Sequence, residues 1–203
     1  MTMRKLRSVF VKKNHRGALT AHKTMGNDER TAALRSRLLL AAQKTPDTIF
    51  RQLRSSVFGW TEPMVGLMRD LYGRNTGVSG SAIVQREGLG RVSVPAQELV
   101  YGDVLYLAKG DRVPADVRIL ECEDFAVDES ALRGKGAPAP KEGKTLPYNS
   151  GSDPLDCENL AFRGDIVVSG SALCLVVGVG ENTLLANSAK AGYTGRPVYQ
   201  YQA

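Results

Sequence analysis

The residues of this 203-residue chain that could do chemistry gather in one polar turn. The turn reads Arg133, Gly134, Lys135 and Gly136, and it follows a strand-like run that begins near Asp124. A guanidinium and an ammonium group separated by one glycine would attract a phosphate group. An ammonium group offers three hydrogen-bond donors and no acceptor, so such a turn could bind a phosphate but could not activate a water molecule.

Acidic residues before this turn could suggest a cation site instead. They are Glu121, Glu123, Asp124, Asp128 and Glu129. They lack the spacing of an EF-hand and form no compact ligand set, so a solvated strand edge is the better interpretation. No other metal site is predicted, because the two histidines lie within the first 23 residues and the three cysteines form no CxxC pair.

Short glycine-containing motifs predict no cofactor site. The run from Lys135 to Pro138 reads KGAP, like a known nucleotide-binding motif, but it stands between predicted strands. The run Gly178-Val-Gly180 lacks the third glycine and the βαβ frame of a dinucleotide fingerprint, and no Walker A sequence occurs. We therefore expect no cofactor.

Basic charge is concentrated at the N-terminus. The net charge of +6 arises in the first 23 residues, which hold seven lysine and arginine residues and no acidic one. The other 180 residues hold 20 basic and 21 acidic residues. We expect residues 1–28 to be a disordered, solvated tail. Attraction of this tail to anionic lipid is the alternative, and no nucleic-acid partner is expected.

Composition indicates a globular chain, with 42% hydrophobic and 24% charged residues. No apolar run reaches the roughly 18 residues that a membrane span needs, so we expect a soluble chain. Apolar residues recur with helical spacing over residues 29–75. Within this range Thr45 followed by Pro46 predicts a helix start, and Gly73 predicts the end of the last helix. Trp60 is expected to anchor these helices on the rest of the fold.

The second half of the chain alternates with the period of β-strands. After a Gly/Ser-rich connector over residues 76–81, a β-rich unit is predicted over 82–192, followed by a tail over 193–203. Separate strands are expected at 165–168 and 171–179, with a turn at Ser169 and Gly170. Three aspartates are expected to hold turns through bonds to nearby backbone groups: Asp103, Asp111 and Asp116.

Several longer motifs occur in a fixed order. Residues 99–118 resemble the PGD…GD.IPAD.R signature of the actuator domain of P-type cation-transporting ATPases, and residues 162–170 resemble the F.GT.V.SG pattern that follows it. The resemblance covers about residues 41–192, and the sequence of residues 153–159 is most similar to that of bacterial magnesium-transporting members. The connector over 76–81 stands where that family has its first two membrane helices, which indicates either a spliced chain or a membrane-free version.

The resemblance implies a fold and a set of partners. The fold would be mainly β, a distorted jelly roll with a small N-terminal helical subdomain, on the cytoplasmic side of an inner or plasma membrane. Its partners would be the phosphorylation domain and the membrane part of a P-type ATPase. The family's DKTGT phosphorylation motif is absent from this sequence, so the chain is not expected to be an enzyme by itself.

The resemblance also implies a role for the polar turn. In the family a Thr-Gly-Glu-Ser loop reaches an aspartyl phosphate, and its glutamate positions the hydrolytic water. Here Arg133, Lys135 and Gly136 replace the threonine, glutamate and serine, and only Gly134 is kept. We expect a domain for conformational coupling or regulation that cannot hydrolyse the phosphate. The alternative is a module that binds phosphate or anionic lipid through the tail and the Arg133/Lys135 turn.

Overall fold

The computed structural model describes residues 27–148 and 153–190. The expected tails therefore lie outside the described residues, apart from Asn27 and Asp28, which begin the first helix. The expected attraction of the N-terminal tail to lipid falls outside them as well. No helix within the described ranges is both long and apolar enough to cross a membrane.

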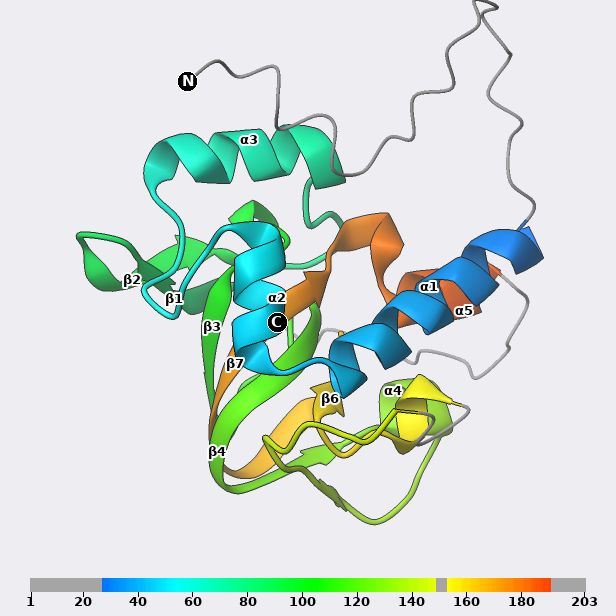
Figure 1. The fold of residues 1–203 in the computed structure, drawn as a ribbon. Helices are drawn as coiled ribbons and strands as arrows, with labels where there is room; N and C mark the ends of the chain where they lie inside the picture. Colours follow the sequence, from blue (N-terminus) through cyan, green and yellow to red (C-terminus); the bar gives the residue numbers. More distant parts are fainter. Residues whose placement is uncertain (1–26, 149–152, 191–203) are drawn as a thin grey trace, which may run out of the picture.

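Helices precede and follow a single antiparallel sheet (Figure 1). The described helices are α1 (Asn27–Gln43), α2 (Pro46–Leu53), α3 (Glu62–Tyr72), α4 (Ser130–Arg133) and α5 (Leu184–Lys190), with 3-10 turns η2 (Ala96–Glu98), η3 (Pro154–Asp156) and η4 (Gly180–Asn182). The strands are β1 (Ser81–Arg86), β2 (Gly90–Pro95), β3 (Val104–Ala108), β4 (Asp116–Asp128), β5 (Ala139–Pro140), β6 (Leu160–Ala161) and β7 (Ile166–Gly178). The expected fold class, mainly β with N-terminal helices, is confirmed.

The sheet is built around the long pair β4 and β7. The strand order is β2-β1-β3-β7-β4-β5, and β6 pairs with β4. Alternate residues of the central strands point into one core, which includes the fully buried Val117, Val127 and Val176. This alternation follows from the two-residue period of a strand, which places every second side chain on the same face.

The expected turn at Ser169 and Gly170 is wrong, because β7 runs through it as one strand. Gly170 has φ +67°, and an added Cβ would lie 2.0 Å from the carbonyl oxygen of Glu123 on β4. The register between β4 and β7 shifts beside it, between Glu123 and Ala126. The glycine therefore permits a close backbone approach at a β-bulge, which the sequence signal of a turn does not distinguish from a turn.

Two predictions about the helices are confirmed. The Thr45 hydroxyl oxygen accepts a hydrogen bond from the Thr48 amide at 3.3 Å, and Pro46 is the first residue of α2. This is the N-cap arrangement that satisfies an otherwise unpaired amide. Trp60 is 2% exposed, and its indole Nε1 donates to the Tyr101 carbonyl at 3.2 Å. It packs with residues of α3 and so anchors the helices on the β unit.

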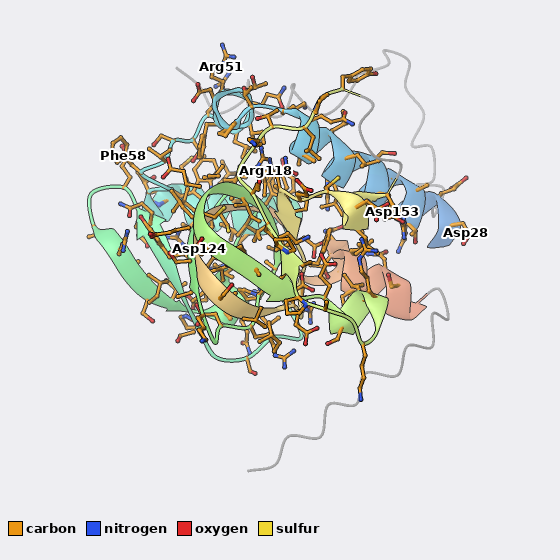
Figure 2. All side chains as sticks on the ribbon, turned by 90° about the horizontal axis from the view of Figure 1, so that it is seen from below. Asp28, Arg51, Phe58, Arg118, Asp124 and Asp153 are labelled. Atoms are coloured by element: carbon orange, nitrogen blue, oxygen red, sulfur yellow. The ribbon has the colours of Figure 1, made fainter. Side chains whose placement is uncertain are left out.

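Arg118 of β4 fastens α1 to the sheet. Its guanidinium is buried and donates to the carbonyls of Ala41 at 3.3 Å, Gly143 at 3.2 Å and Lys144 at 3.2 Å. Figure 2 places Arg118 among the inner side chains. Burial lowers the pKa of Arg118 to about 10, so it stays charged at neutral pH. One side chain thus satisfies a carbonyl at the end of α1 and a carbonyl of Gly143, which lies 25 residues after Arg118.

Asn75 joins the end of the helical segment to the end of the sheet. Its amide Nδ2 is buried and donates to the carbonyls of Ala96 at 2.9 Å and Pro114 at 3.1 Å. Its Oδ1 accepts from the Gly180 amide at 2.9 Å. The segments that follow α3 and β7 therefore meet at one buried side chain.

Candidate functional site

The polar turn begins with a short helix. The Asp128 carboxylate accepts from the Ser130 amide at 2.8 Å, and the Arg133 amide donates to the Glu129 carbonyl at 2.9 Å. Arg133 is thus the last residue of α4, so the polar turn of residues 133–136 starts on the final residue of this helix rather than after a strand. Gly134, at φ 78°, ends the helix.

Glu129 lies beneath the turn and is 7% exposed. Its Oε1 lies 2.5 Å from the ammonium of Lys141, and its Oε2 lies 2.8 Å from Nε of Arg133. The expected solvated edge is correct for three of the acidic residues, Glu121, Glu123 and Asp124, which are exposed. It is wrong for Glu129, because the end of β4 carries this side chain inward to two cations.

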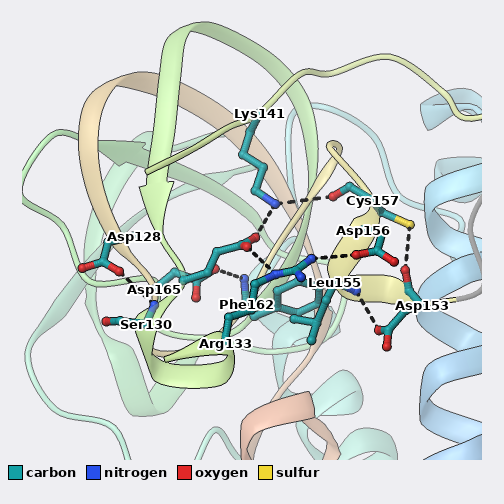
Figure 3. Close-up of polar contacts among 11 residues, drawn as sticks. Asp128, Ser130, Arg133, Lys141, Asp153, Leu155, Asp156, Cys157, Phe162 and Asp165 are labelled. Carbon is teal, nitrogen blue, oxygen red and sulfur yellow. Dashed lines mark hydrogen bonds and ion pairs between the residues drawn. The ribbon is translucent and has the colours of Figure 1, made fainter. Parts of the chain in front are cut away.

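Arg133 uses its other end to bind a second carboxylate. Its Nη2 lies 2.8 Å from Oδ1 of Asp156 in η3 (Figure 3). The hydrogen bond to Asp156 is the main cause that raises the pKa of Arg133. Two carboxylates thus neutralise the Arg133 guanidinium in this structure. Joint binding of a phosphate by Arg133 and Lys135 stays a prediction.

The turn that carries Asp156 is itself tied to α1. Asp153 accepts from the Leu155 amide at 3.0 Å and forms an ion pair with Arg35 of α1 at 2.7 Å. The Lys141 ammonium also donates to the Cys157 carbonyl at 3.5 Å. A continuous series of polar contacts thus leads from α1 through η3 to the base of the polar turn.

Lys135 is the cationic residue at the tip of the turn. Its side chain is exposed, and no ion pair to it is found within residues 27–148 and 153–190. A Cβ added to Gly134 or Gly136 would meet nothing within 4 Å. From Ser130 to Lys141 the chain has no acidic residue. The tip can therefore attract an anion, but it offers no side-chain acceptor that would take a proton from water.

Asp165 lies close to this base as a buried carboxyl group. Its Oδ2 accepts from the Phe162 amide at 2.8 Å, whereas Oδ1 has no partner among the described residues. The pKa of Asp165 is raised to about 8, chiefly by burial, with the charge of Glu129 acting in the same direction and the Phe162 amide and Lys141 acting against it. The group is therefore largely protonated at neutral pH.

Sequence reasoning missed three members of this cluster: Glu129, Lys141 and Asp156. The spacing of Glu129 and Arg133, an acidic and a basic residue four positions apart, could have indicated a helical ion pair. Nothing in the sequence pointed to Asp156, which is 23 residues from Arg133.

Comparison with known proteins assigns the chain to a family. The family model of the P-type ATPase actuator domain matches residues 78–191. The sodium/potassium-transporting ATPase subunit alpha-B of Artemia franciscana is 40% identical over 108 residues, 53% of this chain and 10% of that protein.

Two further relatives are transporters of other ions. The magnesium-transporting ATPase, P-type 1, of Escherichia coli (strain K12) is 42% identical over 94 residues, 46% of this chain and 10% of the relative. The calcium-transporting ATPase type 2C member 1 of Bos taurus is 43% identical over 88 residues, 43% of this chain and 9% of the relative. The matched part spans about a tenth of these relatives. The chain belongs to the family of P-type ATPase actuator domains.

Proposed function

We propose that this chain is an actuator domain that has lost the chemical step and acts in conformational coupling or regulation of a P-type ATPase. The observation that carries the proposal is the tip of the polar turn, where exposed Lys135 stands in place of the family's glutamate. A residue that activates water must accept a hydrogen bond, and a lysine ammonium cannot. Of the two carboxylates that pair with Arg133, Glu129 lies buried beneath the tip, and the exposed Asp156 is held by the guanidinium.

The partners in this proposal are the phosphorylation domain and the membrane part of a transporter, met on the cytoplasmic side of the membrane. We propose a transporter of the magnesium type, because residues 153–159 resemble that branch and a magnesium-transporting ATPase is among the relatives. Sodium/potassium- and calcium-transporting relatives have similar sequence identities. The assignment to the magnesium type therefore depends on the sequence of residues 153–159.

Grafting the turn into a complete magnesium-transporting ATPase tests the loss of chemistry. Replacing the transporter's Thr-Gly-Glu-Ser by Arg-Gly-Lys-Gly should leave formation of the phosphoenzyme intact. Its decay should slow by about a hundredfold or more, the usual contribution of a positioned acid or base. Decay of radiolabelled phosphoenzyme after a chase measures this rate.

A second graft provides the control. Residues 124–141 of this chain are transplanted with and without the changes Arg133→Thr, Lys135→Glu and Gly136→Ser. The triple change should restore fast decay of the phosphoenzyme, because it returns the Thr-Gly-Glu-Ser sequence to the loop. Normal decay with the unchanged residues would contradict the proposal.

A further inference from the structure

We propose that the polar turn holds a latent site for a phosphate group, formed by Arg133 and Lys135 and kept closed by Asp156. The proposal concerns binding alone and stands whether or not the turn has lost hydrolysis. Its ligand class is a phosphate monoester or inorganic phosphate. The Asp156 carboxylate acts as an internal substitute for that ligand, because a guanidinium binds carboxylate and phosphate with the same planar arrangement of donors.

The two ion pairs of Arg133 differ in exposure. The side chain of Glu129, which holds Nε, is 8% exposed, whereas that of Asp156, which holds Nη2, is 60% exposed. The buried contact fixes the direction of the guanidinium. The exposed contact is weak, because water and salt screen an ion pair at the surface. A doubly charged anion can therefore displace Asp156 without disturbing Glu129.

The charges of the cluster explain why Asp156 closes the site. Glu129 shares its charge between Lys141 and Arg133, and the side chain of Lys141 is 3% exposed. Those three residues together carry one positive charge, and Asp156 cancels it. When Asp156 moves away, the positive charge of Arg133 is restored to the surface, and Lys135 adds a second charge two residues further on.

The surroundings of the turn leave room for a ligand. Residues 133–138 are all exposed, and the space around Gly134 and Gly136 is open. Lys135 is also exposed, so its long side chain can turn toward the guanidinium of Arg133. Two cations that converge on one anion bind it more tightly than either does alone, because each adds a charge-assisted hydrogen bond.

Titration of the full chain with inorganic phosphate, followed by ³¹P NMR at physiological ionic strength, tests the site. Asp156→Asn should tighten phosphate binding by about fivefold or more, the equivalent of removing an exposed ion pair. Asp124→Asn is the matched control, because it removes the same charge from an exposed position away from the turn (Figure 2). Asp124 has φ 45°, a conformation that asparagine tolerates, so the control should fold and change binding less than twofold.

A double variant and a vesicle assay complete the test. Adding Lys135→Gln to Asp156→Asn should return phosphate affinity to the wild-type value. Sedimentation of Asp156→Asn and wild type with vesicles that contain phosphatidic acid, a phosphate monoester, compared with phosphatidylcholine vesicles, distinguishes a lipid headgroup from a soluble phosphate as the source. A response of Asp156→Asn to free phosphate supports the site, with or without a vesicle response. Phosphate binding by Asp156→Asn that equals the Asp124→Asn control, or that Lys135→Gln leaves unchanged, overturns the site.

Discussion

Replacing Arg118 with methionine lowers the free energy of unfolding by about 2–4 kcal/mol. Methionine fills a similar volume but donates no hydrogen bond, so the buried carbonyl of Ala41 and the partly buried carbonyl of Gly143 lose their side-chain donor, whereas the Lys144 carbonyl keeps its bond from Asn159. An unsatisfied buried carbonyl costs about 1–3 kcal/mol, and here the donors of Ala41 and Gly143 are lost together. Urea denaturation followed by the fluorescence of Trp60 measures the change, because this tryptophan is buried between the helices and the sheet.

The matched control is the same substitution on an exposed helix surface. Arg51 of α2 is exposed, and Arg51→Met should change the free energy of unfolding by no more than about 0.5 kcal/mol. A loss below about 1 kcal/mol for Arg118→Met would show that water or a shifted backbone replaces the guanidinium.

Asp165→Asn removes a large dependence of stability on pH. In the folded protein the pKa of Asp165 is about 8, against about 3.9 in an unfolded chain. The stabilising contribution of the protonated carboxyl is full below the unfolded-state pKa and is lost as the pH rises through 8. The wild type should therefore lose up to about 1.4 kcal/mol per pH unit relative to the asparagine variant between these two values.

Urea denaturation at pH 5 and at pH 8.5 checks this prediction. The variant should gain on the order of 3 kcal/mol relative to wild type between the two conditions. The charges of Glu129, Lys141 and Asp116 also act on Asp165. All three are present in both proteins, so the difference in free energy of unfolding between variant and wild type at each pH isolates the effect of Asp165. Asp124→Asn, at an exposed position, should follow the wild type in parallel. Parallel curves for Asp165→Asn as well would contradict the assignment of a buried proton.

Local signals in the sequence predicted the elements that depend on local physics. The start of α2 at Thr45 and Pro46 needs only a hydroxyl oxygen and a fixed φ, and both are visible in two residues. Asp103 and Asp111 hold their turns through the amides of Val100 and Ala108, three residues away, as predicted.

Contacts between distant segments were not predictable in the same way. Asp116 binds the amides of Arg163 and Leu184, rather than a neighbouring turn as expected. The choice between the two roles depends on which backbone groups the sheet brings near the carboxylate. The sequence of one short segment does not contain that information.

For the candidate site too, local features were predictable and contacts between distant segments were not. Its chemical character, cationic and without an acceptor at the tip, follows from the residue types at 133–136 alone. The pairing of Arg133 with Asp156 depends on η3 lying beside α4, which three-dimensional packing decides. The spacing of Arg133 and Lys135 therefore did not reveal that Asp156 neutralises the guanidinium.

The hydrogen bonds of Asn75 have a mechanical consequence. Pulling the segments that carry residues 75 and 180 apart requires breaking the bond from the Gly180 amide to the Asn75 side chain and the bonds that Arg163 donates to the carbonyls of Gly77 and Gly180. The Asn75 amide also donates to the carbonyls of Ala96 and Pro114, so the same side chain contacts the β unit at two more points. A displacement of either chain segment would therefore be transmitted to the β unit through the side chain of Asn75.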